Sequence, residues 1–265
     1  GDTSVQTKGT LSVSARNHTS VSSTAAGRAG LAFASLDRLT RATISGTPAA
    51  SISAADIALS AVADGTFTVS ASGTGQVLDA DTLSALAPDR AAAFARIAPA
   101  LGALAFGRVV DDTDASLSGD LAVTADSVRI SSASTDDSRV TAEGADQAAI
   151  AALLSSVSTT GSLDGDVALT ATDLGLDVAT VNSSASAASG APGAALLVTS
   201  VGTEAVLGAG RPLVLAGSLD LVAKQQARAD ATASGVALVL GDYVVATRVL
   251  RALDAWLLRT PDDLQ

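Results

Sequence analysis

The first candidate for a catalytic residue is the single histidine of the chain, His18, which lies in the segment Arg16-Asn17-His18-Thr19. A histidine that acts as a general base needs a nucleophile within hydrogen-bonding reach and an acid that orients the ring. The neighbouring sequence does not indicate which residue would be the nucleophile or the orienting acid. His18 is therefore interpreted as a solvated histidine in a turn between two strands.

Several groups of aspartates have the spacing that can bind calcium, since Ca²⁺ takes six to eight oxygen ligands and often uses close carboxylates in a turn. Neither the Asp-x-Asp-x-Asp-Gly loop nor the Gly-Gly-x-Gly-x-Asp nonapeptide occurs. The favoured interpretation is that these acids lie in turns and keep the protein soluble. If calcium binds, we expect Asp111, Asp112 and Asp114 to be the ligands. The groups are Asp79 with Asp81, Asp111-Asp112-Thr113-Asp114, Asp136-Asp137 and Asp262-Asp263.

Asp120 and Asp166 follow glycine at equivalent positions of a repeated segment. Carboxylates on one face of a solenoid occur in enzymes that cleave polysaccharides. An active site is normally unique within an array of repeats, so this equivalence favours a turn role. We assign no catalytic, cofactor-binding or metal-binding residue and no cofactor, and we expect the chain not to be an enzyme.

The composition narrows the class of protein. The 265 residues are 48% hydrophobic but only 2% aromatic, which favours thin repetitive layers over a globular core. The net charge of −11 and the scattered Lys and Arg exclude a nucleic-acid partner. No apolar run is long enough to insert in a membrane. Cys and Met are both absent, so disulfides are excluded, and the missing initiator favours a segment of a longer protein.

The strands that must position these residues are predicted from a repeated sequence pattern. An apolar-x-apolar-x-Ala alternation, typical of a strand with one buried face, occurs five times, with first residues separated by 46, 64, 46 and 52 positions. A second alternation of small residues follows each copy after a short polar break. Short strands ended by Gly, Asp or Asn indicate a β-helix with three short strands per turn. The five copies are Leu11-Val13-Ala15, Ile57-Leu59-Ala61, Leu121-Val123-Ala125, Val167-Leu169-Ala171 and Leu219-Leu221-Ala223.

Three segments lack this alternation and are predicted to be helical. Residues 78–110 are expected to form a helical insertion, and 145–157 is a weaker candidate. Residues 249–258 place Leu250, Leu253, Trp256 and Leu257 on one face of a C-terminal helix. The predicted organisation is a β-solenoid over 1–248, followed by a helix or a linker to a following domain over 249–265.

The repeated strand Gly165–Ala171 and the Ala-Thr-Ala-Ser-Gly ending at 231–235 resemble the repeats of very large secreted bacterial adhesins of the filamentous-haemagglutinin type. The resemblance covers most of the chain outside 78–110 and the last fifteen or so residues. It implies a right-handed parallel β-helix with coils of about 20 to 25 residues, so that 46 residues would make two coils. About eleven coils at roughly 4.8 Å each would then make a rod on the order of 50 Å long.

The resemblance implies an extracellular or cell-surface location and a structural or adhesive role. The expected partners are neighbouring domains of the same parent chain, further copies of the chain or a surface receptor. A self-assembling surface-layer or filament subunit, with or without calcium dependence, is the alternative, because acidic, Cys-free chains rich in Ala, Thr and Val are typical of such proteins. A polysaccharide-acting enzyme is a minor alternative.

Overall fold

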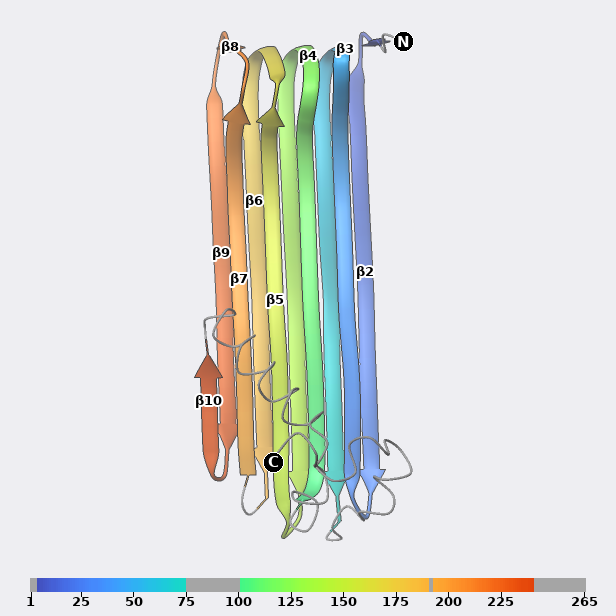
Figure 1. The fold of residues 1–265 in the computed structure, drawn as a ribbon, viewed down its shortest axis with the longest axis vertical. Coiled ribbons are helices and arrows are strands. Elements are labelled where there is room, and N and C mark those ends of the chain that lie inside the picture. Colours follow the sequence, from blue (N-terminus) through green and yellow to red (C-terminus); the bar gives the residue numbers. More distant parts are fainter. Residues whose placement is uncertain (1–3, 75–100, 191–192, 241–265) are drawn as a thin grey trace, which may run out of the picture.

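The structure is a computed structural model that describes residues 4–74, 101–190 and 193–240. The regular secondary structure of these residues consists of β-strands, with no helix, and every strand pairing is parallel. The predicted all-β parallel solenoid is therefore confirmed (Figure 1). The strands are β1 (Ser4–Gln6), β2 (Thr10–Gly27), β3 (Gly30–Gly73), β4 (Leu101–Gly144), β5 (Ala148–Gly165), β6 (Val167–Ser189), β7 (Gly193–Ala209), β8 (Leu213–Leu215), β9 (Leu219–Ala233) and β10 (Val236–Leu240).

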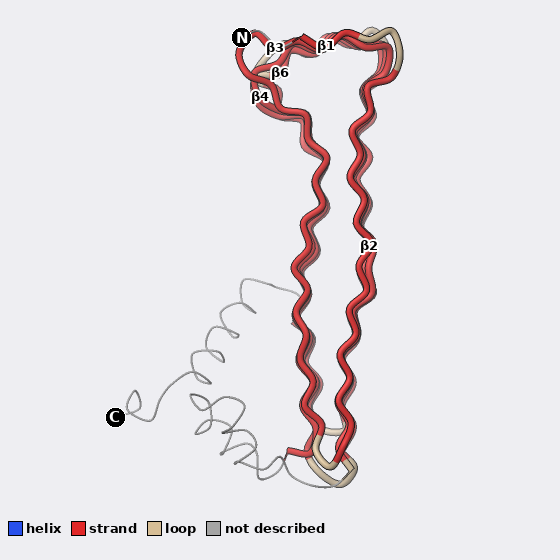
Figure 2. Tube along the Cα trace, turned by 90° about the vertical axis from the view of Figure 1, so that its right-hand side faces the viewer, coloured by secondary structure: helices blue, strands red, loops and turns tan. Residues whose placement is uncertain are grey.

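Each coil has two long walls and one short side, which Figure 2 shows as a narrow outline that widens at one end. Wall A stacks β2, residues 56–73 of β3, 127–144 of β4, 173–189 of β6, and β9. Wall B stacks residues 30–46 of β3, 101–119 of β4, β5, β7 and β10. The short side stacks β1, residues 50–54 of β3, 121–125 of β4, 167–171 of β6, and β8.

The coil is about twice as long as the sequence predicts. Leu11 of β2 pairs directly with Ile57 of β3, 46 residues later, with no strand between them. The expected coils of 20 to 25 residues and the expected eleven layers are therefore wrong, because each wall contains five strands in the described part of the chain. At about 4.8 Å per layer the five layers span roughly 24 Å, whereas an 18-residue wall strand is about 60 Å long. The long axis of the molecule thus runs along the strands (Figure 1).

The polar break after Ala15, at the end of the first repeat copy, is not the predicted turn. Strand β2 continues through Arg16-Asn17-His18-Thr19, with His18 on the outer face and Asn17 and Thr19 facing the interior. The interior of the solenoid is itself polar at this level. The apolar alternation therefore stops although the strand does not.

The five repeat copies belong to two different sides of the coil. Leu11, Ile57 and Leu219 begin copies on wall A, whereas Leu121 and Val167 begin copies on the short side. Ile57 pairs with Val128, which has the same alternation but no final alanine. The intervals of 64 and 52 residues therefore each separate a strand on wall A from a strand on the short side, so they do not measure the length of a coil.

Two of the predicted helices are strands where the structure describes them. Residues 101–110 belong to β4, and 148–157 belong to β5. In β5, Leu153 faces the interior while Ile150 and Leu154 face outward, which gives apolar residues on both faces and imitates helical spacing. The rest of the predicted insertion, 78–100, and the predicted helix at 249–258 lie outside the described residues. No helix within the described ranges has the length and apolarity to cross a membrane.

The interior contains two apolar clusters separated by polar residues. One cluster fills the wide end around Ile57, Leu121 and Leu169, and the other fills the narrow end around Phe67 and Leu153. The buried polar side chains between them are called the polar waist. Its members are Arg38, Thr40, Asp111, Thr113, Ser132, Ser134, Asp136, Ser138, Ser155, Thr159, Thr180, Asn182, Ser184 and Ser186.

Candidate functional site

The candidate site is the charged part of the polar waist, formed by Arg38, Asp111, Asp136 and Ser134. Arg38 of β3 and Asp111 of β4 are in register on wall B. Ser134 and Asp136 come from the wall A part of β4 and face them. The side chains of Arg38, Asp111 and Asp136 are each at most 3% exposed. The coil thus brings together, in its interior, charges that lie up to 98 residues apart in the sequence.

Arg38 binds both carboxyl groups of this cluster. Its Nε donates to Asp111 Oδ1 at 2.9 Å, and its Nη2 donates to Asp111 Oδ2 at 2.8 Å and to Asp136 Oδ1 at 2.6 Å. A planar guanidinium suits this two-point contact with a carboxylate. Ser134 Oγ contacts Asp136 Oδ2 at 3.0 Å and also contacts Asp111 Oδ2. The cluster therefore links β3 with both wall segments of β4 across the interior.

The two carboxyl groups have pKa values shifted in opposite directions. Burial raises the pKa of Asp136 to about 7, with a further contribution from the nearby charge of Asp111. Burial acts in the same direction on Asp111, but hydrogen bonds from Arg38 and Ser134 outweigh it and leave the pKa of Asp111 lowered. Burial also opposes the charge on Arg38, yet contacts with the two aspartates outweigh it and raise its pKa. The cluster thus favours one ionised and one neutral carboxyl group.

Gly65 makes room for the guanidinium. A Cβ atom at this position would collide with Arg38 Nη1 and would lie 3.0 Å from the carbonyl oxygen of Thr19. Nη1 itself is buried and has no hydrogen-bond partner within the described part of the chain. The glycine is required for space at this position, since its φ is not in the left-handed region.

The aspartates proposed as calcium ligands do not converge. Asp111 faces the interior, whereas Asp112 and Asp114 lie on the outer face, because alternate residues of a strand point to opposite sides. Arg41 lies close to both outer carboxylates, with Nε 3.4 Å from Asp114 Oδ2 and Nη2 4.0 Å from Asp112 Oδ2. Within the described ranges, no group of three or more His, Cys, Asp or Glu side chains could hold a metal ion.

The remaining aspartate groups do not form a calcium site either where the structure describes them. In the pair Asp136-Asp137, Asp136 faces the interior and Asp137 the solvent. Asp79 with Asp81 and Asp262 with Asp263 lie outside the described residues.

His18 lies on the exposed outer face of β2, and its Nδ1 contacts Asp64 Oδ1 on β3. This hydrogen bond, the largest contribution, lowers the pKa of Asp64. The histidine thus lies in a strand and has an acid beside it, but among the described residues no hydroxyl or thiol is hydrogen-bonded to its ring. The pair has the form of a surface contact between neighbouring coils.

Asp120 and Asp166 lie at the same corner of successive coils. Each follows a glycine with positive φ, Gly119 at 88° and Gly165 at 81°, and the amide of Leu121 donates to the carbonyl oxygen of Asp166 at 3.4 Å. The side chain of Asp120 forms an ion pair with Arg211, with Nη2 and Oδ1 2.8 Å apart. Both aspartates therefore lie at a repeated turn, as the sequence suggests.

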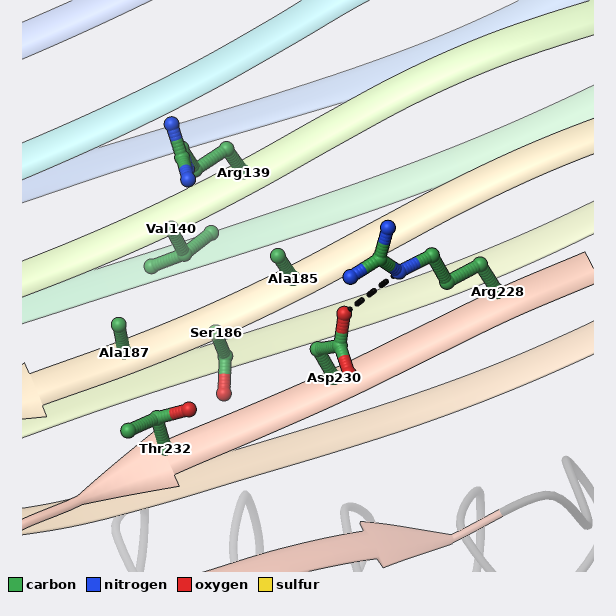
Figure 3. A pocket seen from close by; sticks show the side chains of 8 residues that line it. All are labelled: Arg139, Val140, Ala185, Ser186, Ala187, Arg228, Asp230 and Thr232. Atoms are coloured by element: carbon green, nitrogen blue, oxygen red, sulfur yellow. Dashed lines mark hydrogen bonds and ion pairs between the residues drawn. The ribbon is translucent and has the colours of Figure 1, made fainter.

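A groove of about 340 Å³ lies on the outer face of wall A (Figure 3). Its floor is formed by Ala185 and Ala187 of β6, between Arg139 of β4 and Asp230 of β9, and the small side chains leave the space. Arg228 Nε donates to Asp230 Oδ2 at 2.8 Å, so these two groups already satisfy one another. No histidine lines the groove, and it offers no paired nucleophile and base.

Sequence reasoning missed Arg38, Asp136 and Ser134 as members of one cluster. The available signal was weak: Arg38 is a charged residue at an inward position of the alternation that begins at Ala32. Its partners could be found only with the register of β3 on β4.

Comparisons of this chain with protein-family models, with curated protein sequences and with solved structures find no match. The proposal of a function therefore depends on the chain's own geometry and on the resemblance of its repeats described above.

Proposed function

We propose that this chain is a non-enzymatic structural segment of a large secreted or cell-surface bacterial protein, in which stacked coils space or support other parts of the parent chain. The observation that carries the proposal is the continuous register of the coils. Thr40, Thr113, Thr159 and Thr203 pair in sequence on wall B, so four successive layers repeat the same side chain at the same level. A fold of this kind gains length by adding layers.

The energetics of the fold suit a supporting role. Strands β4 and β5 pair along their walls with the coils on either side, and inward-facing apolar residues stack on their equivalents in the next layer. Stability is then distributed over many similar interfaces between neighbouring coils, as in other repeat proteins. An adhesive role would use the outer faces, and the resemblance to secreted adhesins described above is the reason for proposing a cell-surface location.

The experiment that tests this proposal is cryo-electron microscopy of the purified chain together with sedimentation over a range of concentrations. A structural segment is expected to give isolated solenoid particles whose mass does not depend on concentration or on a calcium chelator. A screen against polysaccharides that detects turnover by the folded chain would contradict the non-enzymatic assignment.

A self-assembling subunit is the second candidate, and the last coil favours it. Leu219 and Leu221 of β9 pair with the fully buried Leu174 and Leu176 but are themselves 47% and 44% exposed. Within the described residues, β9 has a strand partner on one side only. An open layer of this kind can accept another coil from a second copy.

Leu221→Lys tests this alternative, with Val214→Lys as its control. Val214 is 55% exposed, but it lies on the outer face of the short side. If the chain assembles through its open coil, Leu221→Lys should abolish concentration-dependent assembly and Val214→Lys should leave it intact. Equal effects of the two substitutions would exclude assembly through this edge.

A further inference from the structure

The hydroxyl group of Ser134 lies between two buried carboxyl groups. Its oxygen is 3.0 Å from Asp136 Oδ2 and also contacts Asp111 Oδ2. A serine hydroxyl has one hydrogen to donate, and an ionised carboxylate can only accept. If both aspartates were ionised, one of these two contacts would place an oxygen lone pair against a carboxylate oxygen.

The charge balance of the cluster also indicates that one of the two aspartates is protonated. Arg38 supplies one positive charge, and two ionised aspartates would supply two negative charges, all within side chains that are at most 3% exposed. An unbalanced charge in a buried site is costly, and a buried acid usually takes up a proton instead.

We propose that the cluster holds one proton on Asp136, which donates it to Ser134, and that this bound proton stabilises the polar waist of the solenoid. In this arrangement Asp136 Oδ2 donates to Ser134 Oγ, and Ser134 donates to Asp111 Oδ2. Arg38 Nη2 donates to Asp136 Oδ1, and Asp111 remains ionised opposite the guanidinium. Every contact of this set then has one donor and one acceptor.

Few other groups act on Asp136. Among the described residues, the charged side chains that face it are Arg38 of β3 and Asp111 on the opposite wall of β4. Its neighbours in register on wall A are Gly65 of β3 and Asn182 of β6, which do not titrate. The pKa of Asp136, raised to about 7 by burial and by Asp111, agrees with a proton that is bound under neutral and acidic conditions.

The proton makes the stability of the waist dependent on pH. Because the folded state holds the proton up to about pH 7 and the unfolded chain releases it near pH 3.9, the added stability is complete below pH 3.9. It is lost as the pH rises through about 7. A rise in pH from about 4 to about 7 is therefore expected to weaken the attachment of the two walls at the waist, which gives the solenoid a built-in sensitivity to pH.

The direct test is a titration of side-chain carboxyl carbons by NMR on the full chain labelled with ¹³C aspartate. The carboxyl signal that disappears in Asp136→Asn is expected to titrate near pH 7. Asp137, the exposed neighbour on the outer face, serves as the reference, and its assignment comes from Asp137→Asn. Titration of Asp136 near pH 4, the ordinary range of an aspartate, would overturn the proposal.

Unfolding equilibria of the same variants give a second test. Asparagine at 136 reproduces the neutral carboxyl group, since its amide nitrogen donates to Ser134 and its oxygen accepts from Arg38. The unfolding constant of the wild type, divided by that of Asp136→Asn, should rise about tenfold per pH unit between roughly pH 4 and 7. Asp137→Asn should not change the wild-type profile. A pH-independent ratio, or an Asp136→Asn chain that fails to fold, would contradict a bound proton.

Discussion

Arg38 and Asp111, 73 residues apart in the sequence, form a two-point ion pair inside the solenoid, with Nε–Oδ1 and Nη2–Oδ2 distances of 2.9 Å and 2.8 Å. The pair joins successive coils of wall B at the level where the interior is polar. Both side chains are almost fully buried, so neither charge can be stabilised by bulk water if the other is removed.

Asp111→Ala should therefore destabilise the fold strongly. Removing Asp111 takes away the two-point contact with the guanidinium and leaves Asp136, held by Nη2 alone, as its remaining acid. Loss of one partner of a buried ion pair lowers the free energy of unfolding by about 3 to 5 kcal/mol. Denaturant unfolding at neutral pH measures the effect. Asp112→Ala is the matched control, because this carboxylate faces outward and lies 4.0 Å from Arg41; it should cost under about 1 kcal/mol. Similar losses for the two variants would place Asp111 outside the interior.

Gly65→Ala tests the space around the guanidinium. The added methyl group would collide with Arg38 Nη1 and approach the backbone of β2, and overpacking of this kind costs about 1 to 3 kcal/mol. Gly175→Ala on β6 is the control, because a Cβ atom there would have no atom within 4 Å apart from its own chain neighbours. Thermal unfolding should show a lower Tm for Gly65→Ala alone. An unchanged Tm would mean that Arg38 does not lie over Gly65.

Leu169→Asp should disrupt the apolar cluster at the wide end. Leu169 is fully buried between Val123 and Leu213 on the short side, and an unpaired buried carboxylate costs several kcal/mol. Thr170→Asp, on the exposed outer face of the same strand, is the control. Circular dichroism during denaturant unfolding measures both variants. A Leu169→Asp chain as stable as the wild type would show that this side chain does not point inward.

Removal of calcium should leave the melting temperature unchanged. Asp111 is separated from Asp112 and Asp114 by the strand, and the two outer carboxylates lie beside Arg41. Differential scanning calorimetry with added calcium and with a chelator tests this expectation. A rise in Tm with calcium that Asp112→Asn and Asp114→Asn remove would restore these two residues as ligands.

The sequence predicts the fold class well because the interior is apolar over most of each wall. Inward positions such as Leu11 and Ile57 alternate with polar ones, and they stack in the structure as the repeat suggests. The size of the coil could not be predicted in the same way. At Asn17 and Thr19 the strand passes the level of the polar waist, and polar residues at inward positions remove the apolar alternation that marks a strand.

The charged cluster cannot be predicted from the sequence for a different reason. The local sequence predicts that Asp111 and Asp136 are acidic residues in turns. Their burial depends on which face of β4 each occupies, and their contact with Arg38 depends on the register of strands far apart in the chain. Neither can be derived from local spacing, particularly since residues 74–100 lie between β3 and β4 in the sequence.

The length of the coil is tested most directly by disulfide formation in a chain that has no natural cysteine. Ser22 of β2 and Thr68 of β3 are paired in register on the outer face. In-register neighbours on adjacent strands are about 4.8 Å apart, within the range that a disulfide can bridge. Ser22→Cys combined with Thr68→Cys should form an intramolecular disulfide rapidly, whereas Ser22→Cys combined with Ser45→Cys, on opposite walls, should not. Rapid bridging of 22 to 45, with none between 22 and 68, would contradict the 46-residue coil.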